Sequence, residues 1–102
     1  MRIIRHPIHI TDYQAVDLPA AGELLSVAAS LTAPDYEIDL WSLDYERGDP
    51  RQVGVYVIGT GHPMPEQLRN VYPDAFREFV GTVVTPSGLV WHLFQGPLME
   101  AS

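Results

Sequence analysis

The residues best suited to chemistry in this chain are four histidines and the Gly-Thr-Gly-His segment at residues 59–62. Adjacent glycines can present backbone amides to an anion, and the threonine and histidine would add side-chain donors. A phosphate-binding loop normally carries a lysine and leads straight into a helix, whereas this chain has no lysine and Pro63 follows the motif. Glycines also suit a strand end, where the backbone takes angles that other residues resist. We therefore expect this segment to end a strand and turn the chain. If a small ligand binds, the candidate residues are Gly59, Thr60, Gly61 and His62.

The histidines do not show the spacing of a metal site, which needs several converging ligands. His6 and His9 are three residues apart in an expected strand, so they would point to opposite faces. By alternation with apolar neighbours, His6 and His92 are expected to face the core and to be held by a hydrogen bond. The chain has no cysteine, which excludes thiolate ligands. We expect neither a metal nor another cofactor.

Catalytic groups show no recognisable arrangement. No serine has the flanking glycines of a nucleophile elbow, and a lone histidine near a threonine is poor support for a general base. The sequence therefore favours a protein that is not an enzyme. An enzyme that uses His62 or His92 is the weaker alternative.

An acidic segment at residues 35–49 holds six carboxylates against the single Arg47. Alternation would place two of these acids on one face with a tryptophan, a residue type that is over-represented in binding hot spots. Such a face could attract a basic partner. The competing interpretation is a solvated edge strand whose charges prevent aggregation. The candidate partner-binding residues are Glu37, Asp39, Trp41 and Asp44.

The elements that must position these residues are mostly strands, because the hydrophobic period is close to two. Pro7 lacks an N–H and predicts that the first strand lies at a sheet edge. A helix is expected only over residues 64–72, and Thr85–Gly88 predicts a hairpin turn with glycine at positive φ. We predict one all-β domain over residues 1–102, an antiparallel sandwich or small barrel of six to seven strands with a frayed tail from about residue 96. The expected strands are residues 2–10, 15–18, 24–31, 37–43, 51–58, 77–84 and 89–94.

Composition limits the partners. The net charge is −7 at pH 7, which argues against nucleic acid, since binding to phosphates needs a cationic surface. The chain has no apolar run near the length of a membrane-spanning helix. The absence of cysteine fits the cytoplasm, and no signal peptide is recognisable. The last hairpin is apolar on both faces, which predicts a homo-oligomer that covers the second face.

Four segments occur in an order that resembles a family of small, uncharacterised bacteriophage proteins, many of them from phages of actinobacteria. The resemblance covers residues 18–95, and it departs where relatives carry glutamines but this chain has Ala28 and Ala29. Further departures are extra residues near 32–37 and 66–78. The segments are GELLSV (22–27), LWSL (40–43), GTGH (59–62) and GLVWHLF (88–94).

The resemblance implies a phage accessory protein acting in the cytoplasm of an infected host cell, and it brings no known activity. With the acidic segment, it leads us to expect a domain that binds a host or phage protein. The first alternative is a small-ligand or nucleotide-binding barrel that uses the Gly-Thr-Gly-His loop. The second alternative is a structural or decoration protein of the virion.

Overall fold

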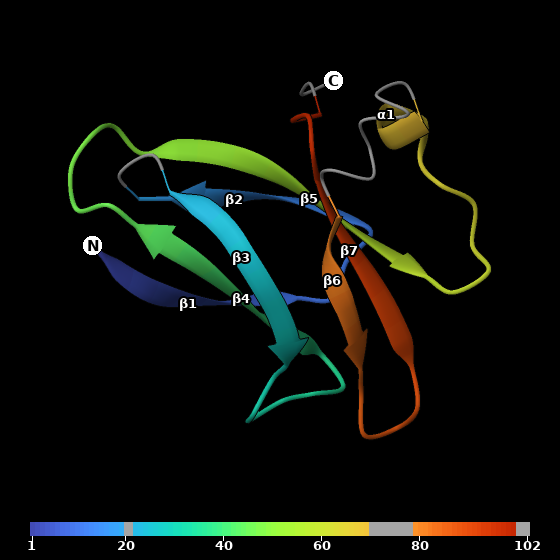
Figure 1. The fold of residues 1–102 in the computed structure, drawn as a ribbon. Helices are drawn as coiled ribbons and strands as arrows, with labels where there is room; N and C mark the ends of the chain where they lie inside the picture. Colours follow the sequence, from blue (N-terminus) through green and yellow to red (C-terminus); the bar gives the residue numbers. More distant parts are fainter. Residues whose placement is uncertain (20–21, 70–78, 100–102) are drawn as a thin grey trace.

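The protein is an all-β sandwich in a computed structural model that describes residues 1–19, 22–69 and 79–99 (Figure 1). Every pair of neighbouring strands is antiparallel. The elements in chain order are β1 (Arg2–His9), β2 (Tyr13–Leu18), β3 (Glu23–Ala29), β4 (Glu37–Asp44), β5 (Arg51–Gly59), α1 (Glu66–Arg69), β6 (Phe79–Val84) and β7 (Val90–Gly96).

The strands form two sheets. The three-stranded sheet has the order β1-β4-β3, and the four-stranded sheet has the order β2-β5-β7-β6. β1 lies at an edge, as Pro7 predicts, because an edge strand can lack a ladder donor. β4 is central in its sheet, so the interpretation of the acidic segment as an edge strand is wrong.

The main core lies between the two sheets. Alternate residues of each strand point inward, as the period of two predicts. The buried members are Ile8, Val16, Leu18, Ile38, Leu40, Val53, Val55, Val57, Val83 and Leu93.

A second, smaller core covers the outer face of the four-stranded sheet. Tyr56 and Ile58 point to that face of β5, and the buried Leu68 of α1 packs on them. Tyr13, Met64 and Phe94 complete this cluster. The second apolar face of the last hairpin is thus covered partly by the chain's own α1 segment.

The helix begins later than the sequence predicts. Residues 64–72 were expected to be helical, but residues 64 and 65 are not, the described helical residues are Glu66–Arg69, and residues 70–72 lie outside the described part of the chain. A single turn of this kind has little stability of its own and depends on tertiary packing. No helix among the described residues is long and apolar enough to cross a membrane.

A β-bulge changes which side of β3 is buried. Alternation predicts Leu25, Val27, Ala29 and Leu31 on one buried face. In the structure the register with β4 shifts between Leu24 and Ser26, and the extra residue rotates the side chains that precede it. Leu24, Val27 and Ala29 therefore pack on the core, whereas Leu25 is 46% exposed and Leu31, beyond the strand, is exposed.

The last hairpin has the predicted turn, but the tail differs. Gly88 has φ of 91°, and its N–H donates to the Thr85 carbonyl at 2.9 Å. The predicted frayed tail is wrong for residues 96–99. Gly96 still belongs to β7, the Tyr56 hydroxyl donates to the Pro97 carbonyl, and the Met99 N–H donates to the Tyr13 hydroxyl at 2.9 Å. Residues 100–102 lie outside the described part.

Candidate functional site

The Gly-Thr-Gly-His segment ends β5 and turns the chain, as the sequence predicts. Gly59 is the last residue of the strand, and the His62 N–H donates to its carbonyl at 3.0 Å. Gly61 has φ of +84°, the value required at the third position of a type II turn. Gly59 matters for a different reason, because it leaves room for the His62 ring: a Cβ there would lie 2.9 Å from His62 Nδ1.

The His62 side chain is exposed at a point where three hollows meet. Among the described residues, its imidazole has no hydrogen-bond or ion-pair partner. The hollows have volumes of about 380, 320 and 230 Å³. The second is lined by Thr60 and Trp91, and the third by Thr60 and His92. The loop predicted from the sequence therefore lies where these three concave surfaces converge.

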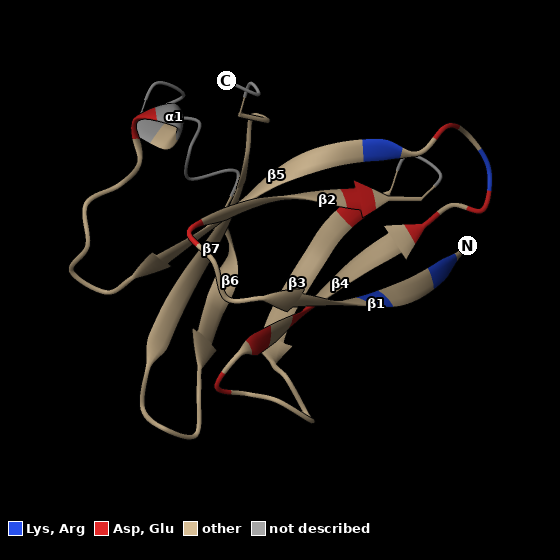
Figure 2. Cartoon of the chain, turned by 180° about the vertical axis from the view of Figure 1, so that it is seen from behind, with Lys and Arg blue, Asp and Glu red and all other residues tan. Residues whose placement is uncertain are grey.

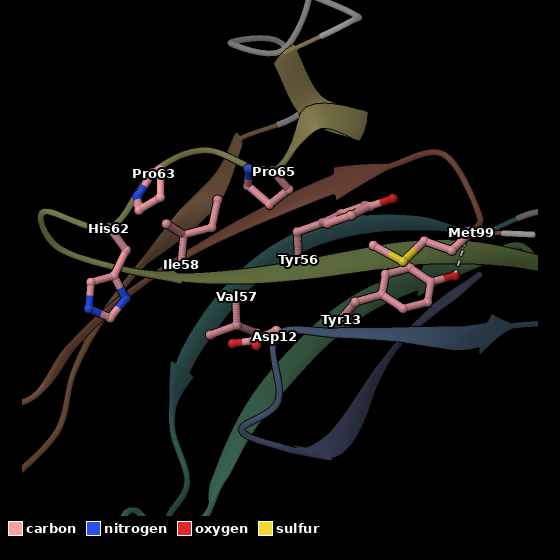
Figure 3. Close-up of a pocket in the computed structure, with 9 residues that line it drawn as sticks. All are labelled: Asp12, Tyr13, Tyr56, Val57, Ile58, His62, Pro63, Pro65 and Met99. Carbon is pink, nitrogen blue, oxygen red and sulfur yellow. Dashed lines mark hydrogen bonds between the residues drawn. The ribbon is translucent and has the colours of Figure 1, made fainter.

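The largest of these three hollows lies at a step in the four-stranded sheet. β2 begins at Tyr13, opposite Tyr56, whereas β5 continues to Gly59 without β2 beside it. The Val57 N–H donates to the Asp12 carbonyl at 3.1 Å, which fixes Asp12 beside the end of β5, where β5 pairs with β7 on its other edge. Figure 3 shows the lining, with Val57 and Asp12 on one side of the β5 ribbon and the two prolines on the other. Its described lining is Asp12, Tyr13, Tyr56, Val57, Ile58, His62, Pro63, Pro65 and Met99.

Sequence reasoning missed Asp12, Tyr13 and Tyr56 as site residues. No motif marks them, and the β2–β5 register alone places the two tyrosine rings 5.1 Å apart between centroids. Burial raises the pKa of Tyr56, and the neighbouring Tyr13 adds to the effect. The ring of Tyr56 is fully buried, so it supports the hollow from beneath.

His92 was expected to face the core, and the structure corrects this. Its ring lies on the outer face of the four-stranded sheet together with Phe94, because Leu93 is the residue that points into the core. The predicted hydrogen bonding is confirmed, since Nε2 lies 2.7 Å from Thr60 Oγ1 and Nδ1 lies 3.0 Å from Thr82 Oγ1. Both ring nitrogens are engaged by hydroxyl groups, which fixes the ring.

His6 faces the core, as predicted. Its Nε2 lies 2.7 Å from the hydroxyl of Ser42, which is fully buried. Burial lowers the pKa of His6, because desolvation disfavours the charged imidazolium. Among the described residues, no group of three or more His, Asp or Glu side chains could hold a metal ion.

The four candidate partner-binding residues do not share one exposed face. Glu37, Asp39 and Trp41 lie on the outer face of the three-stranded sheet, whereas Asp44 lies at the end of the inner face. Asp39 is only 2% exposed, and its Oδ2 lies 3.7 Å from Arg5 Nη1. A strand pattern cannot reveal such burial, because it arises from the side chains of the two neighbouring strands.

Asp44 is part of a network at the start of β1. Its Oδ1 accepts the Glu46 N–H at 2.8 Å, and its Oδ2 lies 3.0 Å from Arg2 Nε. The Glu46 N–H, followed by Arg2, holds the pKa of the Asp44 carboxyl below its usual range. The amino group of Met1 in turn donates to Glu46 Oε2 at 2.6 Å. These contacts give Asp44 a structural role in tying the N-terminus to the end of β4.

Comparison with known proteins identifies the family without an activity. No curated protein and no solved structure matches the chain. One family model, described as a domain of unknown function, matches residues 1–101, which is almost the whole chain. The chain therefore belongs to the domain-of-unknown-function family DUF7352.

Proposed function

We propose that this domain binds another protein through the outer face of its three-stranded sheet. This outer face is formed by side chains that share a side in the strand register. They are Ile3, Arg5, Pro7 and His9 of β1, Glu37, Asp39, Trp41 and Leu43 of β4, and Glu23, Ser26 and Ala28 of β3.

The outer face carries apolar side chains that neither hydrophobic core uses. Ile3 is 63% exposed, and Ile3, Trp41 and Leu43 belong to neither core cluster. Antiparallel sheets can expose one face to water, but such a face is then normally polar. Here Ile3, Trp41 and Leu43 stand among polar side chains, with Ile3 exposed and the other two half-buried, and apolar groups left at a sheet surface favour an interface.

The observation that carries the proposal is the arrangement of Arg5, Asp39 and Trp41. Arg5 and Trp41 are directly opposite each other on β1 and β4. The buried carboxylate of Asp39 lies beside the guanidinium of Arg5, which is itself 45% exposed. Tryptophan and arginine dominate binding hot spots, and an arginine held by a carboxylate is already oriented for a partner.

We further propose a host or phage protein as the partner, because the sequence resembles small phage proteins. The test compares capture of proteins from infected-cell lysate by the native domain, a Trp41→Ala variant and a Val84→Ser control. Val84 is 63% exposed on β6, so its change leaves the proposed face intact. The proposal is supported if the native domain and Val84→Ser capture one protein in a stoichiometric amount and Trp41→Ala does not. Equal capture by the native domain and both variants contradicts it. Asp39 is a poor probe, because replacing a buried carboxylate perturbs the fold.

A second copy of the chain could occupy the same face, in an oligomer or in a virion. Sedimentation of the purified native domain and of Trp41→Ala separates these possibilities. An oligomer that dissociates on Trp41→Ala would show that the face is used for self-association. A monomer in both cases leaves the face free for a different protein.

A further inference from the structure

We propose that the largest hollow binds a small organic cation, an ammonium or guanidinium group carried on an apolar stem. The hollow is the one that Figure 3 shows beside the end of β5, on the opposite sheet from the face proposed above. This hollow and the proposed protein interface therefore lie on different sheets and share no residue.

The size and walls of the hollow suit a small molecule. Its volume of about 380 Å³ is within the usual range for ligand sites, roughly 300–1,000 Å³. Tyr13, Pro63, Pro65 and Met99 form apolar walls, and the backbone of the last of these is tied to the Tyr13 hydroxyl. Such walls would hold the apolar stem of a ligand.

The charges that line the hollow favour a positively charged ligand. Asp12 is the only carboxylate and no arginine is present among the described residues that line the hollow. The arginines whose side chains the structure describes lie in β1, in the β4–β5 loop and at the start of β5, and they are the blue segments of Figure 2. The whole chain carries a net charge of −7, so its field also attracts cations. A phosphate or carboxylate ligand would meet an uncompensated negative charge here.

Two polar groups of the lining have unused hydrogen-bonding capacity. The carboxylate of Asp12 and the imidazole of His62 are exposed, and neither has a side-chain partner among the described residues. A carboxylate that is ionised only accepts hydrogen bonds, so Asp12 complements a ligand rich in donors. An imidazole can both accept and donate, so His62 can also receive a donor from such a ligand. An aromatic ring such as that of Tyr13 also attracts a nearby cation.

The position of Asp12 is set by the sheet. Its carbonyl accepts the Val57 N–H, and the next residue begins β2. Gln14 Nε2 donates to the His9 carbonyl at 2.7 Å and to Thr11 Oγ1 at 2.9 Å, which braces the turn before it. The backbone of Asp12 is thus fixed at the edge of the hollow before a ligand arrives, so only the short side chain remains to be ordered on binding.

The experiment compares three probes of one shape and different charge: benzylamine, benzyl alcohol and benzoate. Each is titrated into the ¹⁵N-labelled native domain, and amide shifts give both the site and the dissociation constant. We expect benzylamine to bind most tightly, with the largest shifts at Asp12, Tyr13 and His62. Equal or tighter binding of benzoate, or shifts confined to another part of the domain, would overturn the proposal.

Charge-matched variants test the role of the carboxylate. Asp12→Asn should weaken benzylamine binding roughly tenfold, since a charge-assisted contact is lost. Asp49→Asn makes the same change in net charge at the opposite end of β5 and should leave binding unchanged. If the two variants weaken binding equally, the effect comes from the net charge of the domain, and the proposed contact with Asp12 is refuted. Agmatine and a blocked arginine tripeptide then distinguish a free cation from the side chain of a protein.

Discussion

Alanine substitutions at Gly59 and Gly61 should separate two reasons for glycine within one four-residue motif. Gly61 has positive φ and open space around it, so an added methyl group meets backbone strain but no neighbour. Gly59 does not have positive φ, but an added Cβ would lie 2.9 Å from Nδ1 and 3.0 Å from Cε1 of the His62 ring. The first position tests the turn, and the second tests the packing of the candidate site.

The expected cost at Gly61 follows from its backbone conformation. An L-residue in the left-handed region loses roughly 1–2 kcal/mol. Alanine also has less conformational freedom than glycine in the unfolded chain, which raises the free energy of unfolding by about 0.4–1 kcal/mol. Gly61→Ala should therefore lower the free energy of unfolding by about 1 kcal/mol, and removal of the His62 side chain should not change this cost.

Gly59→Ala should depend on His62. Moving the exposed ring aside costs roughly 0.5–1.5 kcal/mol, which nearly cancels the gain from replacing a strand glycine, about 0.5–1 kcal/mol. In a His62→Ala background the obstruction is absent, and Gly59→Ala should then stabilise the domain. Urea unfolding of the single and double variants measures this coupling, expected to be about 0.5–1.5 kcal/mol. Additive effects, or a loss at Gly59 larger than that at Gly61, would refute the proposed packing of His62.

Three further predictions follow from the core. Because burial lowers the pKa of His6 below its unfolded value of 6.5, the unfolded chain takes up the proton first as pH falls. The contribution of His6 to stability is therefore complete above about pH 6.5 and decreases below it; His6→Gln should flatten the change in urea midpoint between pH 7.5 and 5, and an unchanged slope would contradict the assignment. Leu24→Asp should lower the free energy of unfolding by at least about 2 kcal/mol, whereas Leu25→Asp should lower it by less than about 0.5 kcal/mol. The reverse order in thermal unfolding would contradict the β-bulge. Leu68→Ala should cost about 2–4 kcal/mol and speed hydrogen exchange in α1, while similar exchange in both proteins would mean that this side chain does not anchor the helix.

Much of the fold could be predicted because alternation reports which face of a strand is buried. The edge position of β1 followed from Pro7, and the hairpin turn followed from Gly88. The register of β3 could not be predicted, because its bulge is set by pairing with β4. The side on which His92 lies could not be predicted either, since β7 is apolar on both faces and alternation does not distinguish them.

Local backbone preferences and composition are enough to predict the all-β class, the strand ends at glycine and proline, and the negative net charge. The folded arrangement of the two sheets set which polar groups are available. It buried Asp39 beside Arg5, engaged Asp44 with Arg2, and placed Asp12 with His62 around one hollow. The physical reason is that burial and pairing of a side chain depend on residues of neighbouring strands, which are distant in the chain.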